Sequence, residues 1–163
     1  MKKLFLFMFI ASFFSCQTNH LASNDATSKN KKLYNQLYSS NGNIFTIGSS
    51  EFKSSYMWSY TNDDIIVYNL SNGKVISEKK LKLRSERNNQ WLKNPSKDDD
   101  GIDKCIAVDG FTLMYKVKNN ESFIERRFPL EYECMKNSVY ESTFFKTLIE
   151  DVNYYNIGWK KVQ

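Results

Sequence analysis

Histidine is almost absent from this chain, and its scarcity limits the catalytic chemistry that the sequence allows. The single histidine, His20, lies in a polar stretch near the start. A Ser-His-Asp or Cys-His arrangement therefore cannot form within the later, more apolar residues. A glycine-rich phosphate loop, a His-Glu-x-x-His motif and a Cys-x-x-Cys motif are also missing. A pair of carboxylates remains as a catalytic arrangement, but the sequence alone pairs none, so no catalytic residue and no cofactor is assigned.

Long apolar runs and internal repeats are missing too, and these absences limit the number and kind of domains that the chain can form. The longest apolar run, residues 4–14, is shorter than the roughly 20 residues that an ordinary membrane-spanning helix needs. No repeat of blade or solenoid length is present. Residues 33–163 are enough for one domain with a hydrophobic core and too few for two.

A basic face is lacking in the expected folded part, although the formal net charge is +5. Five of the 23 basic residues but only one of the 18 acidic residues precede residue 33, which leaves 18 basic against 17 acidic residues beyond it. The excess charge thus belongs to the first residues and not to one face of the domain. We therefore expect no nucleic-acid partner.

Strand-forming residues dominate the first half of the expected domain. Residues 44–47, 56–60 and 65–70 are rich in aromatic and β-branched side chains and are separated by turn-forming residues. The pair Asn72-Gly73 favours a tight hairpin turn before a further strand that continues to Leu83. These strands predict an antiparallel meander.

A long hairpin is predicted between Cys105 and Cys134. A turn centred on Asn119-Asn120 would make Phe111 face Phe128, with apolar side chains alternating on one side of the ribbon. Five residues fall on the opposite, more polar side, namely Thr112, Met114, Lys116, Glu125 and Arg127. The same register places the two cysteines opposite each other.

The C-terminal region predicts one helix. Ser138 and Glu141 fit a capping box, and apolar residues at 145, 148, 149 and 152 follow at helical spacing up to about Asn153. The expected fold class is α+β: a single domain of antiparallel β meander and hairpins, with this helix packed on the sheet.

The first residues have the pattern of an export signal. Two lysines precede the apolar run, and Phe13-Phe14-Ser15-Cys16 follows it. This stretch resembles the lipobox of bacterial lipoproteins, although phenylalanine stands where leucine is usual at the third position before the cysteine. The resemblance implies cleavage after residue 15 and a lipid on Cys16 that anchors the protein to a membrane of the bacterial cell envelope, facing the periplasm or the exterior. Residues 16–32, which are polar, are then expected to form a flexible tether.

Cysteine usage agrees with an exported protein. With Cys16 lipidated, the other two of the three cysteines are left to form one disulfide, Cys105–Cys134.

Two sets of residues are candidates for ligand contact. Trp91, on a polar stretch, and Tyr154 and Tyr155 are the aromatic side chains that we expect to face a ligand, with burial in the core as the alternative. Asp98, Asp100 and Asp103 form a weak calcium candidate, because the fit to an EF-hand loop fails at its first and twelfth positions.

Three functional hypotheses follow. The first is a non-catalytic, lipid-anchored binding or structural module, its ligand or protein partner unknown. The second is a membrane-anchored inhibitor or immunity protein, and the third is a carboxylate-dependent hydrolase.

Overall fold

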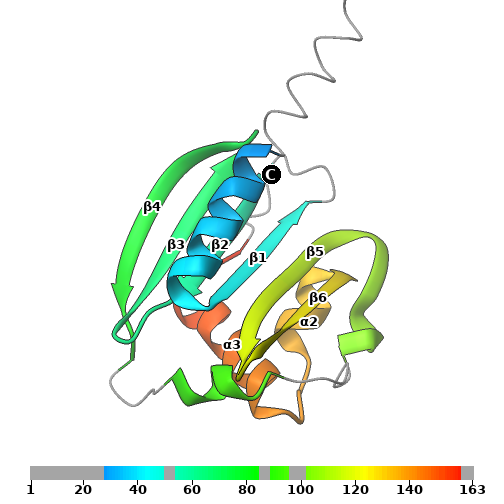
Figure 1. The fold of residues 1–163 in the computed structure, drawn as a ribbon. Coiled ribbons are helices and arrows are strands. Elements are labelled where there is room, and N and C mark those ends of the chain that lie inside the picture. Colours follow the sequence, from blue (N-terminus) through cyan, green and yellow to red (C-terminus); the bar gives the residue numbers. More distant parts are fainter. Residues whose placement is uncertain (1–27, 50–53, 85–88, 96–101, 159–163) are drawn as a thin grey trace, which may run out of the picture.

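A computed structural model describes residues 28–49, 54–84, 89–95 and 102–158, and these form an α+β fold (Figure 1). One antiparallel sheet of six strands has the order β4-β3-β2-β1-β5-β6. The N-terminal helix, residues 28–41, lies on one face, and the other helices lie on or near the opposite face. The strands are β1 (Asn43–Ser49), β2 (Ser54–Tyr60), β3 (Asp64–Ser71), β4 (Lys74–Lys82), β5 (Ile106–Asn119) and β6 (Ser122–Leu130). The remaining helices are the 3-10 helices η1 (Asn89–Lys93) and η2 (Ile102–Cys105) and the α-helices α2 (Tyr132–Asn137) and α3 (Thr143–Tyr154).

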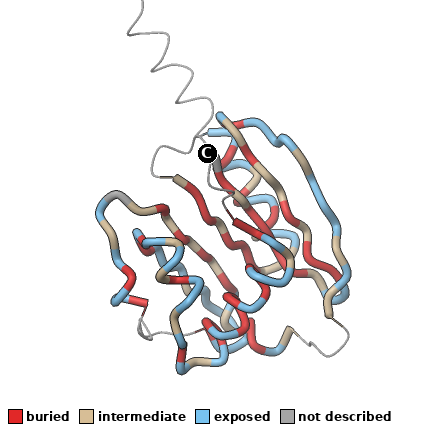
Figure 2. The backbone as a smooth tube through the Cα atoms, turned by 180° about the vertical axis from the view of Figure 1, so that it is seen from behind, coloured by how far each residue is buried: buried red, intermediate tan, exposed pale blue. Residues whose placement is uncertain are grey.

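The predicted meander is confirmed as β1 to β4. The β3–β4 turn has positive φ at Asn72 (49°) and Gly73 (72°), the conformation of a tight two-residue hairpin turn. Figure 2 shows this edge of the sheet largely in the colour of exposed residues, and most residues of β4 are exposed. Burial therefore increases from the β4 edge toward β1.

The predicted hairpin is present as β5 and β6, but its register differs from the expected one by two residues. Phe111 faces Leu130, Leu113 faces Phe128, and Asn119 closes the ladder against Ser122. The turn is therefore Asn120-Glu121, with Asn120 in the positive-φ conformation. Since side chains alternate with a period of two, this shift leaves every residue on its predicted face.

The predicted disulfide joins Cys105, in η2, to Cys134, in α2, with 5.5 Å between the Cα atoms. It lies beyond the open end of the hairpin rather than within the ladder, because pairing is irregular between Ile106 and Phe111. Gly110 permits this irregularity, since a Cβ atom there would collide with the carbonyl oxygen of Leu130. The bridge thus attaches the short helix α2 to the start of β5.

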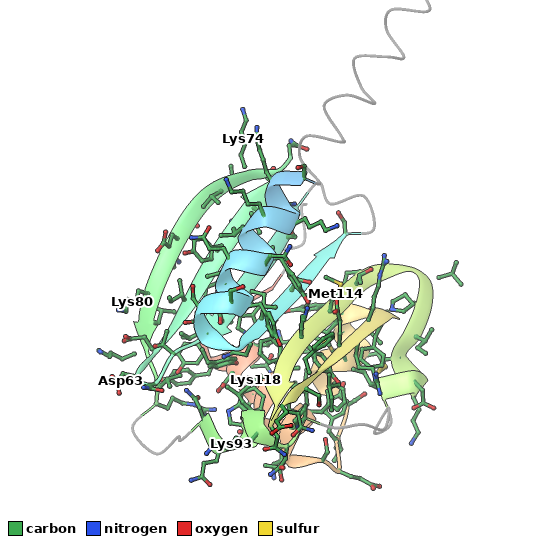
Figure 3. All side chains as sticks on the ribbon, in the orientation of Figure 1. Asp63, Lys74, Lys80, Lys93, Met114 and Lys118 are labelled. Atoms are coloured by element: carbon green, nitrogen blue, oxygen red, sulfur yellow. A yellow bond between two sulfur atoms is a disulfide. The ribbon has the colours of Figure 1, made fainter. Side chains whose placement is uncertain are left out.

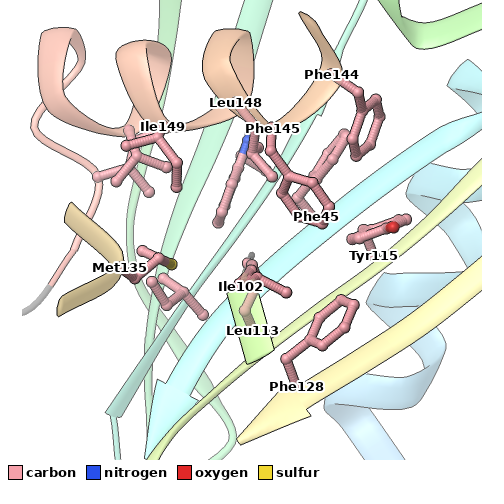
Figure 4. Packing of buried hydrophobic residues seen from close by; sticks show 14 of the residues in the cluster. Phe45, Ile102, Leu113, Tyr115, Phe128, Met135, Phe144, Phe145, Leu148 and Ile149 are labelled. Carbon is pink, nitrogen blue, oxygen red and sulfur yellow. The ribbon is translucent and has the colours of Figure 1, made fainter. Parts of the chain in front are cut away.

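The main core lies between the sheet and α3, and Figure 4 shows its aromatic and aliphatic side chains meeting there. The apolar face predicted for the C-terminal helix is confirmed, with Phe145, Leu148 and Val152 buried. The helix begins later than expected, because Ser142, not Ser138, accepts a hydrogen bond from the amide of Phe145. Ser138 instead donates to the carbonyl oxygen of Cys134 at the end of α2.

A second apolar cluster, under the N-terminal helix, was not predicted. Tyr34 and Leu37 of this helix are buried against Ile44, Met57 and Leu70 on the other face of the sheet. Residues 28–32, expected to belong to the tether, are helical instead. The physical reason is burial: the helix covers apolar side chains of β1, β2 and β3 that would otherwise be exposed.

Candidate functional site

A groove of about 400 Å³ lies between the N-terminal helix and the sheet, on the face opposite α3. Its walls come from this helix and from β1, β2, β5 and β6, with Met114 beside the helix (Figure 3). This volume is at the small end of the range for small-molecule sites, and such sites are typically mostly apolar with a few placed polar groups.

Small side chains on neighbouring strands make the groove hollow. Gly48 of β1 is paired with Ser55 of β2 on one side and Thr112 of β5 on the other, so the first row of its floor carries no large side chain. In the next row, Thr46 lies between Met57 and Met114. Methionine side chains are flexible and polarizable, so they adapt to ligands of different shapes.

Three polar atoms in the walls are buried and have no hydrogen-bond partner within the described part of the chain. They are Oδ1 of Asn30, the hydroxyl of Tyr34 and Oγ of Ser49. Asn30 and Tyr34 are each 8% exposed and lie one helical turn apart, on the same face of the N-terminal helix. An unsatisfied buried polar group costs about 1–3 kcal/mol, so these atoms favour a bound partner.

The Tyr34 hydroxyl stays protonated in this environment. Burial raises the pKa of Tyr34, and the negative charge of the nearby Glu125 raises that pKa further. A side-chain hydrogen-bonding interaction with the Glu125 carboxylate adds to this rise in the pKa, although the hydroxyl makes no hydrogen bond of standard length and angle. At neutral pH the groove therefore contains a neutral phenol that can donate a hydrogen bond.

Positive charge outweighs negative charge along the groove. Lys31, Lys116 and Arg127 line it together with one carboxylate, Glu125. Lys116 Nζ lies 3.9 Å from Glu125 Oε2, whereas neither Lys31 nor Arg127 forms an ion pair with any residue that the structure describes. The groove thus has a surplus of two cationic side chains.

Aromatic contacts hold Lys116 in place near one end of the groove. Its ammonium group lies 4.5 Å from the ring centre of Tyr38 and 4.2 Å from that of Phe123. These two rings meet edge to face at 6.4 Å. Lys116 is therefore held by cation–π contacts beside Glu125 and is a fixed part of the wall.

The aromatic ligand candidates from the sequence do not line this groove. For Trp91 the structure shows the alternative, burial in the core: it is 8% exposed and packs 5.2 Å from Tyr60 and 5.3 Å from Phe144 between ring centres. Its large apolar ring gains more from the core than from solvent, although the segment around it is polar. Tyr154 is 62% exposed and stacks with Arg84, while the Tyr155 hydroxyl donates to the carbonyl oxygen of Lys82.

The remaining sequence candidates lie elsewhere. Asp103 is exposed in η2, and Asp98 and Asp100 fall outside the described residues, as do Cys16 and His20. Among the residues that the structure describes, no group of three or more His, Cys, Asp or Glu side chains is placed to hold a metal ion.

Sequence reasoning placed five groove residues correctly on one side of the hairpin but missed the helix that turns this side into a groove. The signal was present: Leu33, Tyr34, Leu37 and Tyr38 recur at the spacing of one helical face. Because the preceding residues are polar, the whole stretch up to residue 32 was assigned to a flexible tether and no helix was predicted.

No protein-family model, curated protein or solved structure matches this chain. In the described ranges, none of the helices has the length and apolar character needed to cross a membrane.

Proposed function

We propose that this protein is a non-catalytic, small-molecule-binding module held at a bacterial membrane by a lipid on Cys16. The observation that supports binding is the groove between the N-terminal helix and the sheet, with its three unpartnered buried polar atoms. Its lining combines apolar surface, hydrogen-bonding groups and charge, and contains neither histidine nor cysteine. This combination is suited to holding a molecule and supplies no nucleophile–base pair of the Ser-His or Cys-His kind.

Anchoring would keep the groove close to the membrane. Residue 28, where the described helix begins, comes twelve positions after Cys16 in the sequence. Even a fully extended chain spans at most about 3.6 Å per residue, so the start of the helix would lie within roughly 40 Å of the lipid. The groove would then sample molecules near the membrane surface.

Replacing Cys16 by alanine is expected to release the protein from the membrane, because the thiol that carries the lipid is gone. The measurement is the share of protein in the membrane and soluble fractions of cells that produce the full chain. Thr18→Ala is the control, since a nearby residue is replaced without touching the lipobox-like stretch or the disulfide. A Cys16→Ala protein that stays in the membrane fraction would contradict anchoring by this residue.

Filling the groove is expected to abolish small-molecule binding. Met114→Trp adds bulk beside the small side chains of the floor, where a ligand would otherwise lie. The measurement is methionine-methyl NMR of the full chain during a screen of small, water-soluble compounds. Binding should shift the signals of Met57 and Met114 but not that of Met135, which is buried in the main core on the other face.

The Met114→Trp protein should lose the response of Met57 to every compound that shifts it in the unchanged chain. If no compound shifts Met57 and Met114 in the unchanged chain, or if every such compound shifts Met57 equally in the Met114→Trp protein, the groove is not a small-molecule site.

A further inference from the structure

We infer that the molecule bound in the groove is a small amphipathic anion, with a carboxylate or phosphate head and a short apolar body. This inference rests on the proposed binding function and specifies the chemical class of the ligand. The charge balance, the buried hydrogen-bonding groups and the apolar floor each support it.

The charge balance selects an anion. Lys31, on the N-terminal helix, and Arg127, on β6, both line the groove as exposed side chains, and neither has an ion-pair partner within the described residues. An arginine guanidinium presents paired donors that match a carboxylate or a phosphate. A ligand anion would supply the partner that these side chains lack.

Glu125 does not reverse this selection. Its carboxylate lies 3.9 Å from the ammonium group of Lys116, which Tyr38 and Phe123 hold in place. The carboxylate is therefore already compensated by a cation of the wall. A cationic ligand would have to compete with Lys116 and would meet Lys31 and Arg127 as like charges.

The buried polar atoms supply donors for an oxyanion. The raised pKa of Tyr34 keeps its hydroxyl protonated, and the Ser49 hydroxyl has a proton to donate as well. Both oxygens lack a partner in the described structure, and the residues that carry them line the groove. The side-chain oxygen of Asn30, also without a partner, adds a hydrogen-bond acceptor for a hydroxyl or other donor on the ligand.

The apolar part of the ligand would lie over the floor. Met57 and Met114 flank Thr46 there, and Gly48 leaves the adjacent row without a side chain. The volume of about 400 Å³ limits this part to a ring or a short chain.

The test compares four probes with one apolar body and different heads: 4-phenylbutyrate, 4-phenylbutyl phosphate, 4-phenylbutanol and 4-phenylbutylamine. Each is titrated into the full chain at pH 7 while the methyl signals of Met57, Met114 and Met135 are followed. At least one of the anions should bind at least about tenfold more tightly than the alcohol, with the amine weakest. The two anions distinguish a carboxylate site from a phosphate site.

Two variants locate the head of the ligand. Arg127→Gln is expected to weaken binding of the preferred anion about tenfold, the value of a charge-assisted hydrogen bond. Arg126→Gln is the matched control, because the neighbouring residue points to the opposite face of β6 and should leave affinity unchanged. Tyr34→Phe should weaken the anion about fivefold, yet leave the melting temperature unchanged or higher, because its buried hydroxyl makes no hydrogen bond of standard geometry with the protein.

The results of these titrations either support or overturn the inference that the ligand is an anion. Equal affinity for anion, alcohol and amine, or tighter binding of the amine, would overturn it while leaving a binding groove in place. An anion whose affinity does not respond to Arg127→Gln binds without this wall and would also overturn it. If none of the four probes shifts Met57 and Met114 although other compounds do, the inference fails and the proposed function stands.

Discussion

Replacing Phe45 by alanine is expected to lower the free energy of unfolding by about 3–5 kcal/mol, the usual cost of removing a buried phenylalanine. Phe45 is 0% exposed, and its ring stacks on Trp58 at 5.5 Å between ring centres. It also contacts four further rings, those of Tyr60, Trp91, Tyr115 and Phe144. The cavity would therefore open at the centre of the aromatic cluster, where β1, β2, β5, η1 and α3 meet. Denaturant unfolding of the full chain, followed by circular dichroism, measures the change.

Phe123→Ala provides the matched control for this substitution. Phe123 is 53% exposed and contacts Tyr38 and Lys116 on the opposite face of the sheet. Its removal opens no enclosed cavity, so we expect a loss of about 1 kcal/mol or less. Equal losses for the two variants would contradict the central position of Phe45 in the core.

Breaking the disulfide is expected to lower the free energy of unfolding by about 3–4 kcal/mol, the chain-entropy value for a loop of this length. Cys105 and Cys134 are 29 residues apart in sequence, and the loop between them contains the whole β5–β6 hairpin. The six-residue helix α2 is attached to η2 through this bond. Since small domains are stable by about 5–15 kcal/mol, this loss is a large fraction of the total.

The disulfide is tested by unfolding the full chain with and without reductant, beside the double variant Cys105→Ala and Cys134→Ala. Reductant should lower the stability of the unchanged chain and leave that of the double variant unaffected. Intact mass after alkylation gives an independent check. Thiols at residues 105 and 134 that react without reductant would show that the bond does not form.

The two faces of the sheet differ in packing: one carries the main core and the other carries the groove. The aromatic cluster on the α3 side contains the largest fully buried side chains, among them Trp58, Phe45 and Phe144. The face under the N-terminal helix has a smaller cluster and small side chains at Thr46 and Gly48. Substitutions in the groove should therefore change ligand affinity more than stability, because few large core side chains depend on them.

The β5–β6 hairpin shows which structural features the alternation of apolar and polar residues predicts and which it does not. Alternating side chains correctly assigned Leu113 and Tyr115 to the buried face and Met114 to the other. The register was displaced by two residues because Asn119 and Asn120 are equally suited to positive φ, and a displacement of two preserves both faces. Pairing with β1 and closure at Ser122 set the actual register.

By itself the sequence determined the strands, the Asn72-Gly73 turn, the apolar face of α3 and the pairing of Cys105 with Cys134, because each depends on the spacing of residues along the chain. Only the tertiary structure decided that Trp91 is buried and that the N-terminal helix covers the second face of the sheet. The groove belongs to this second group. Its walls come from the helix and four strands, and residues as distant in sequence as Asn30 and Arg127 line one groove only when these elements pack together.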